Sequence, residues 1–327
     1  MNVFLFQPEE YKRMYSCTAM TTEEWCSNSN DVTVESIIYF TMGTLFLITY
    51  VPVLLLMLQR KYTVHSCYRF MIFLGVQDII LLLILTIIQP YVFYVGAVYC
   101  CSPTVIYILG CLFKFLWSTQ TCTSTLLALN RFSDIIEFKW MRWLFEENRV
   151  YGWMALVVAY SGYNFLFFPP VLISSTNRVG SPNPYFGVND RRVPTINIKE
   201  YVSINVLYHD VAFLTVLSTL YVLFIVIVFW KLRAVSTVNM TKAKIKLIVQ
   251  VSMISGLVYA TSICFFLTPK SLQWLNAYVF RVEAGLGGII YLCCNREIRN
   301  DWKTCFTRMW KGKKRVSVVH VTSVQKC

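Results

Sequence analysis

The sequence predicts an all-α membrane protein, a bundle of seven transmembrane helices with the N-terminus outside and a short amphipathic eighth helix. Three observations lead to this prediction. First, 56% of the 327 residues are hydrophobic and only 14% are charged, whereas soluble domains carry about a quarter charged residues. Second, seven apolar runs are each long enough to cross a bilayer core of roughly 30 Å. Third, the basic residues gather in alternate connections, as the positive-inside rule describes for cytosolic loops.

The run 110–131, GCLFKFLWSTQTCTSTLLALNR, is the most informative of the seven. Before its closing arginine it carries one formal charge, Lys114. A soluble core helix would need a polar face, and this run offers only Ser, Thr and Gln. At about 1.5 Å per residue it is long enough to cross the bilayer core. We interpret it as the third, central helix of the bundle.

The chain divides into an extracellular segment 1–33, a seven-helix region 34–294 and a C-terminal segment 295–327. The predicted spans cover residues 34–58, 70–93, 110–131, 150–174, 201–230, 247–267 and 274–294. The connection 175–200 contains three prolines and two glycines, which predicts turns rather than a helix. In the C-terminal segment, Trp302, Phe306 and Met309 fall on one face among basic residues. We expect this amphipathic helix to lie at the lipid surface.

The distribution of Lys and Arg sets the orientation. Twenty-one of these residues lie in the first, third and fifth connections and the C-terminal segment, against seven in the N-terminal segment and the other connections. This asymmetry places the N-terminus outside. The basic residues of the cytosolic connections also account for the formal net charge of +13, so this charge does not indicate a nucleic-acid partner. The partner that we expect instead is the lipid bilayer.

Several motifs are specific in their order and spacing. The second run contains SCYRFMIFLGVQDIILL, the corner before the third contains GAVYCCSPTVIYILG, the third ends LALNR, the fifth begins YVSINVLYHD and the seventh ends IIYLCCNREIRNDW. Over nearly its whole length the chain resembles the nematode serpentine chemoreceptors of class T, within the seven-helix G-protein-coupled receptors. The resemblance implies a chemosensory receptor of the plasma membrane, with the sensory cilium as a further expectation. Such a receptor binds a small molecule in the outer part of the bundle and activates a heterotrimeric G protein.

Two other functions are compatible with a multi-span chain. A transporter usually shows two related halves with broken helices, and no internal repeat is visible in the sequence. A membrane enzyme needs clustered catalytic or metal-ligating side chains, but His65, His209 and His320 lie far apart. We therefore expect no enzymatic activity, no metal site and no cofactor, and a multi-span transporter is the alternative function.

Receptors of this superfamily carry an arginine at the inner end of the third helix, which either pairs locally or is released to meet the G protein. The resemblance assigns this role to Arg131, with Asn130 in place of the usual acidic neighbour, so the same ion pair cannot form. The alternative is an arginine that snorkels to the membrane edge.

Tyr291 resembles the tyrosine switch of the seventh helix, with Gly287 and Gly288 where that switch has Asn and Pro. We expect a cavity beside Arg131 surrounded by Lys231, Lys242, Lys244 and Lys246; alternatively these lysines only contact anionic lipid.

A buried polar site is expected around Asp78, in the middle of the second span. A carboxylate at this depth is costly and faces the bundle interior. The resemblance implies an ion-and-water site below the ligand pocket, and a protonated acid hydrogen-bonded to its neighbours is the alternative. We expect Glu283 to approach the Asp78 layer or an amide such as Gln120.

The residues expected in the ligand pocket are Lys114, Trp117, Asp210 and Arg281. Lys114 lies 17 residues before Arg131, which is about 25 Å along a helix and within the outer third of the membrane. Arg281 is expected at the pocket floor. The two cations would favour a small anionic or carbonyl-bearing ligand. The alternative is purely structural pairing of Lys114 with Asp210, or of Arg281 with Asp78.

The usual receptor disulfide joins the third helix to the connection before the fifth. Residues 175–200 contain no cysteine, so that disulfide cannot form. The other outside thiols belong to Cys17 and Cys26. We expect Cys100 or Cys101 to bond to one of these two, which would fold the N-terminal segment over the pocket. A Cys17–Cys26 bond alone is the alternative.

Overall fold

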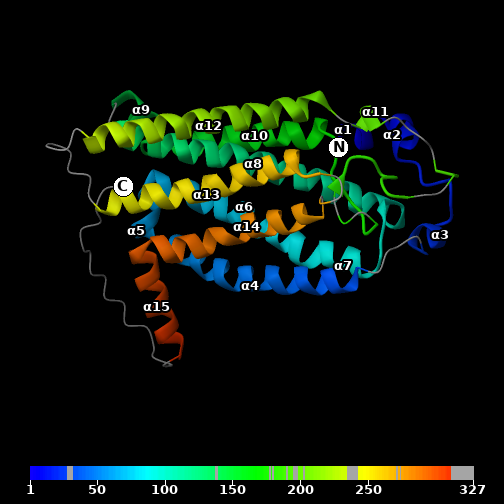
Figure 1. The fold of residues 1–327 in the computed structure, drawn as a ribbon, viewed down its shortest axis with the longest axis horizontal. Helices are drawn as coiled ribbons and strands as arrows, with labels where there is room; N and C mark the ends of the chain where they lie inside the picture. Colours follow the sequence, from blue (N-terminus) through cyan, green and yellow to red (C-terminus); the bar gives the residue numbers. More distant parts are fainter. Residues whose placement is uncertain are drawn as a thin grey trace.

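The computed structural model describes a helical protein in which long helices run side by side (Figure 1). Short N-terminal helices gather at one end of the bundle, and the last helix, α15, leaves the other end at a steep angle. The described residues are 1–27, 32–136, 139–176, 178, 180–188, 191–193, 198–201, 203–233, 242–269, 272 and 274–310.

Three short helices form the N-terminal segment: α1 (Asn2–Phe6), α2 (Pro8–Tyr15) and α3 (Thr22–Ser27). The bundle contains α4 (Thr33–Met57), α6 (Ser66–Leu83), the π-helical turn η1 (Ile84–Ile88), α7 (Gln89–Tyr94), α8 (Pro103–Ile136), α10 (Arg149–Phe167), α12 (Ile204–Arg233), α13 (Lys242–Leu267) and α14 (Leu275–Cys294). The connections hold α5 (Arg60–Thr63), the 3₁₀ turn η2 (Tyr99–Cys101), α9 (Lys139–Phe145), β1 (Leu172–Ile173), β2 (Gly180–Ser181) and α11 (Ile198–Tyr201), and α15 covers Arg296–Trp310. The two strands pair antiparallel, with Leu172 opposite Ser181.

Each predicted span overlaps one of these long helices, but several ends differ. Helix α8 begins at Pro103, well before residue 110, and continues to Ile136. Helix α10 ends at Phe167 instead of residue 174, because Pro169 and Pro170 follow and proline disfavours helix in itself and in the residue before it. The prediction that residues 175–200 form turns rather than a helix is wrong at one place, since the start of α11 lies there.

Five helical stretches of the described chain are long and apolar enough to cross a membrane. They are Thr33–Met57, Ser66–Tyr94, Pro103–Asp134, Ile204–Ile227 and Leu275–Cys294, and α13 adds a shorter apolar stretch, Val249–Phe265. The side chains are distributed as expected for a bundle in lipid, with apolar residues on the outer surface and polar residues inside. Apolar Ile48 and Val226 are exposed, whereas polar Gln120 and Thr121 are fully buried. A bundle with apolar outer surfaces and polar contacts between its helices is typical of a membrane protein.

The glycine pair Gly287–Gly288 allows α14 to pack directly against α4. A Cβ atom added at Gly288 would lie 2.8 Å from Tyr50 Cα, and one added at Gly287 would lie 2.7 Å from Tyr50 Oη. Both distances are shorter than real Cβ contacts. Helix α14 runs through this pair without interruption, so the glycines provide close helix approach.

The π-helical turn η1 leaves one backbone acceptor without a backbone donor. In an α-helix the Leu85 carbonyl would accept from the N–H of Gln89. Here the N–H of Gln89 instead donates to the Ile84 carbonyl. The residue five positions after Leu85 is Pro90, which has no N–H. The Leu85 carbonyl therefore needs a donor from elsewhere in the bundle.

Candidate functional site

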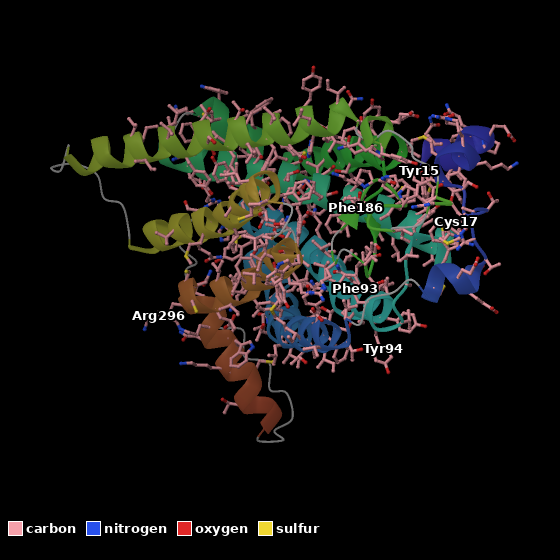
Figure 2. All side chains as sticks on the ribbon, turned by 45° about the vertical axis from the view of Figure 1, so that its right-hand side comes forward. Tyr15, Cys17, Phe93, Tyr94, Phe186 and Arg296 are labelled. Atoms are coloured by element: carbon pink, nitrogen blue, oxygen red, sulfur yellow. A yellow bond between two sulfur atoms is a disulfide. The ribbon has the colours of Figure 1, made fainter. Side chains whose placement is uncertain are left out.

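Two disulfides join the N-terminal segment to the corner that precedes α8. Cys17 is bonded to Cys100, and Cys26 is bonded to Cys101 (Figure 2). The structure thus has the first of the two predicted arrangements, with both corner cysteines used instead of one. Cys17 and Cys26 are not bonded to each other.

An aromatic cluster packs the N-terminal segment onto the end of the bundle. The Tyr15 ring lies 5.1 Å from that of Tyr107 in α8 and 5.8 Å from that of Tyr201 in α11, measured between centroids. The Tyr201 hydroxyl donates to the Met14 carbonyl at 2.6 Å, and the Tyr185 hydroxyl donates to the carbonyl of residue 16 at 2.6 Å. We call the segment 1–27, held in this way, the N-terminal cap.

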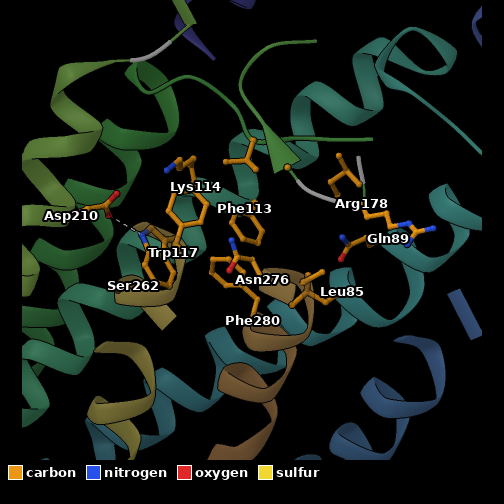
Figure 3. A pocket seen from close by; sticks show the side chains of 15 residues that line it. Leu85, Gln89, Phe113, Lys114, Trp117, Arg178, Asp210, Ser262, Asn276 and Phe280 are labelled. Carbon is orange, nitrogen blue, oxygen red and sulfur yellow. Dashed lines mark hydrogen bonds between the residues drawn. The ribbon is translucent and has the colours of Figure 1, made fainter. Parts of the chain in front are cut away.

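A cavity of about 220 Å³ lies at the same end of the bundle, among η1, α7, α8, α12, α13 and α14 (Figure 3). The β1–β2 hairpin separates it from the cap. Successive residues of a strand point to opposite sides: Leu172 packs in the aromatic cluster, and Ile173 lines the cavity. The N–H of Val171 donates to the Gly110 carbonyl at 3.3 Å, which ties this hairpin to α8.

Three of the four predicted pocket residues line this cavity: Lys114, Trp117 and Asp210. The indole N–H of Trp117 donates to Asp210 Oδ1 at 3.1 Å, as the dashed line in Figure 3 shows. Lys114 and Asp210 do not form an ion pair within 4.0 Å in the described part of the chain. Asp210 nevertheless lies close enough to act electrostatically on the Lys114 ammonium. The alternative of structural pairing between them thus has no contact ion pair among the described residues, only this longer-range attraction.

Arg281, the fourth predicted residue, does not line the cavity. It is fully buried behind the wall, where its guanidinium lies 3.6 Å from the centre of the Tyr39 ring. The Nη2 atom of Arg281 donates to the Leu85 carbonyl at 2.9 Å and to Gln89 Oε1 at 2.8 Å. Arg281 thus supplies the donor that the π-helical turn requires. The alternative of a structural pairing of Arg281 with Asp78 is not found among the described contacts.

The expected polar layer around Asp78 is present. The Tyr50 hydroxyl donates to Asp78 Oδ2 at 2.6 Å, and the Gln120 amide donates to Asp78 Oδ1 at 2.7 Å. Glu283 is buried and lies within electrostatic range of Asp78. Gln120, one of the two partners proposed for Glu283, is instead hydrogen-bonded to Asp78.

Arg131 lies at the other end of α8 and is almost fully buried. It forms an ion pair with Asp134 at 3.0 Å and donates to Asn130 Oδ1 at 2.7 Å. Arg131 also lines a small cleft between α8, α12 and α13, together with Tyr221 and Val251. The side chains of the lysines predicted around this cleft, Lys231, Lys242, Lys244 and Lys246, lie outside the described residues.

The family described as "Serpentine type 7TM GPCR chemoreceptor Srt" matches residues 1–315 of this sequence. The chain belongs to this family. Its sequence is also similar to that of Serpentine receptor class T-55 from Caenorhabditis elegans, with 24% identity over 301 residues, which cover 88% of this chain and 79% of that protein. The predicted membership in the class T serpentine chemoreceptors is confirmed. The chain is thus a membrane protein of a seven-transmembrane receptor family, and this family is one of receptors rather than enzymes.

In this Srt chemoreceptor, Tyr291 and Asn295 connect α14 to the start of α15. Tyr291 is fully buried beside Tyr50, with ring centroids 6.0 Å apart. The Asn295 side chain accepts from the N–H groups of residues 297 and 298 at 3.0 and 3.2 Å, which caps the first turn of α15. Its amide donates to the Tyr68 hydroxyl at 2.6 Å. The Tyr62 hydroxyl donates to Asp301 at 2.7 Å, so α15 is held against the α5–α6 corner.

The sequence reasoning missed three residues of these sites. Asp134 was visible as the carboxylate three positions after Arg131, a spacing at which helical side chains meet. Gln89 was visible as a lone amide in an apolar run, ILTIIQPYV. Asn276, at the start of α14, lines the cavity, and its position near a helix end carried no signal of its own.

Proposed function

We propose that this Srt family member is a chemosensory G-protein-coupled receptor of the plasma membrane, including that of the sensory cilium. The seven bundle helices cross the membrane, and α15 lies on its inner surface. A small molecule binds in the cavity lined by Lys114, Trp117 and Asp210. The observation that carries this proposal is the position of the cavity, enclosed between helices at the capped end, in a chain whose family consists of chemoreceptors.

Two independent features support an extracellular cap. Disulfides persist in oxidising compartments such as the cell exterior, and both disulfides join the cap to the corner before α8. The excess of Lys and Arg lies in the connections at the opposite end, which favours a cytosolic location for that end.

Coupling to a heterotrimeric G protein would begin at the Arg131 end of α8. Helix α8 carries both Lys114 and Arg131, so one helix connects the cavity to the cleft with α12 and α13. A ligand shifts the population toward a state to which it binds more tightly. In the proposed active state, Arg131 is released from Asp134 and contacts the G protein, while the Asp78 layer and Tyr291 lie between the two sites. Family membership favours this receptor function over the transporter alternative.

The test is a small-molecule screen on cells that express the receptor together with a G-protein activation sensor. At least one compound should give a dose-dependent signal. The variant Arg131→Ala should lose that signal while its surface expression persists. Lys139→Ala, which changes an exposed basic residue of α9, is the matched control and should retain the signal. Full signalling from Arg131→Ala would reject the assigned coupling role.

A further inference from the structure

The groups around the cavity carry one more positive than negative charge. Arg178, at the hairpin, pairs with Glu35 at 2.8 Å, so these two charges cancel. Three charges remain among the lining residues and their direct partners: Lys114 and Arg281 are cations, and Asp210 is an anion. Within the described part of the chain, neither cation has a carboxylate within 4.0 Å, and Asp210 acts on Lys114 only from a longer distance. An excess charge in a low-dielectric site is costly unless it is compensated.

Arg281 acts on the cavity through Gln89. A guanidinium can only donate hydrogen bonds, so the carboxamide oxygen of Gln89 must face Arg281, as their 2.8 Å contact shows. The amide NH₂ of Gln89 is thereby turned toward the cavity, into which the side chain points in Figure 3. No acceptor for this NH₂ or for the Lys114 ammonium exists among the described residues. With respect to the described residues, the cavity therefore presents two donors without an acceptor.

The remaining wall is mainly aromatic and fixes the size of an occupant. Phe113, Trp117, Phe265 and Phe280 line the cavity, and the Trp117 and Phe280 rings meet edge to face with centroids 5.4 Å apart. An apolar cavity of about 150 Å³ holds one benzene molecule. By this comparison a cavity of about 220 Å³ holds roughly nine non-hydrogen atoms.

We infer that the cavity binds a small organic carboxylate, an aromatic or branched aliphatic acid of roughly nine non-hydrogen atoms. Its carboxylate pairs with Lys114, which neutralises the excess positive charge. Its apolar body packs between the aromatic rings. The amide of Gln89 donates to a second acceptor where the ligand carries one, and Arg281 is a positioning residue that does not touch the ligand. This inference rests on the proposed function for the identity of the pocket.

The test uses two sets of probes that share a skeleton and differ in charge. The first is benzoate, benzamide and benzylamine, and the second is 4-methylpentanoate, its amide and the corresponding amine. Thermal unfolding of the purified full-length receptor in lipid nanodiscs is measured with each probe at constant pH and ionic strength. The carboxylates should raise the Tm in a saturable manner, and the amines should not. Amides or amines that raise the Tm as much as the carboxylates would overturn the inference, and so would carboxylates without effect at millimolar concentration.

Variants then locate the binding site. Lys114→Met should weaken carboxylate binding about tenfold or more, because a hydrogen bond to a charged group is lost. Lys114→Arg should retain part of the affinity. Lys12→Met is the matched control, since Lys12 is exposed in the cap and pairs with the exposed Glu9 at 3.3 Å. Unchanged carboxylate affinity in Lys114→Met would overturn the inference. The charge selectivity of the unmodified receptor provides an independent test if Lys114→Met does not fold.

The outcome separates the ligand class from the proposed function. If carboxylates bind but no G-protein signal follows, the coupling proposal fails and the ligand class stands. If only amines or neutral compounds activate the G-protein sensor, the receptor function stands and the carboxylate inference fails.

Discussion

Arg131 Nη1 lies 3.0 Å from Asp134 Oδ2, and both residues belong to α8. The pair therefore holds the arginine side chain along its own helix. It also replaces the ion pair that Asn130 cannot form, because the carboxylate is placed three positions after the arginine instead of next to it. Release of Arg131 from Asp134 requires a change in the direction of the arginine side chain relative to α8.

Asp134→Asn should raise basal signalling. An ion pair of this kind contributes about 1 kcal/mol, which corresponds to roughly a fivefold shift in a two-state equilibrium. Ligand-free G-protein activation, normalised to surface expression, measures the effect. Glu146→Gln, which removes an exposed carboxylate of the same connection, should leave basal signalling unchanged. Equal basal signals from the two variants would show that the pair does not hold the resting state.

Serine double variants should report the disulfide connectivity. Cys17→Ser with Cys100→Ser, or Cys26→Ser with Cys101→Ser, removes one disulfide and leaves no new thiol. The mixed variant Cys17→Ser with Cys101→Ser removes both disulfides and leaves Cys26 and Cys100 reduced. In the chain-entropy description, a disulfide that closes a loop of this length contributes roughly 4–5 kcal/mol.

The mixed variant should therefore show the largest fall in Tm and two additional alkylated thiols after denaturation without a reductant. Thermal unfolding and mass spectrometry of the alkylated protein measure both quantities. A mixed variant as stable as the two matched variants would mean that the cysteines pair in another way.

Arg281→Met should destabilise the receptor strongly. The substitution leaves the Leu85 carbonyl and Gln89 Oε1 buried without their donor, and each such group costs about 1–3 kcal/mol. Arg178→Met is the comparison, because its ion pair with Glu35 is partly exposed and contributes little. Tm and surface expression should both be lower for Arg281→Met. Equal stability of the two variants would contradict the positioning role of Arg281.

Acid should destabilise the inner end of the bundle through His65. Burial lowers the pKa of His65 below its ordinary value of 6.5, and the positive charge of Arg131 adds to this effect. The folded protein thus binds this proton less readily than the unfolded chain, so stability is complete above about pH 6.5 and decreases as the pH falls below it. The Tm of His65→Gln should decline less between pH 7.5 and pH 5.5. Identical declines in both proteins would exclude His65 as the source.

The spans were predictable because the thickness of a bilayer dictates the length of an apolar run. Their ends were less predictable, as α8 shows, since its additional turns lie in the corner fixed by Cys100 and Cys101. Prolines did mark one end, that of α10, where Pro169 and Pro170 follow. The cap was recognised through its cysteines, but its short helices depend on tertiary packing rather than on any local periodicity: α1 and α2 pack against Tyr107, and α3 packs through Trp25 against Tyr185.

The partners of buried charges were harder to predict than their depth. Position along α14 placed Arg281 near the level of the cavity, as helix rise requires. Its actual partners depend on the π-helical turn, because only this turn leaves the Leu85 carbonyl without a backbone donor. A pattern of apolar residues contains no signal for such a turn. For Asp134, by contrast, the helical spacing from Arg131 was already present in the sequence.

The contact of Gly287 and Gly288 with Tyr50 limits how the receptor can change shape. Any side chain at Gly288 would collide with the backbone of α4, and Tyr50 is in turn hydrogen-bonded to Asp78 of α6. Helices α4, α6 and α14 are thereby joined by close packing and a hydrogen bond. We expect them to move together as one rigid body. A transition that opens the cleft at Arg131 would then consist of a displacement of α12 and α13 against this fixed half. Substitution of Gly288 by alanine would therefore disturb the packing of this fixed half.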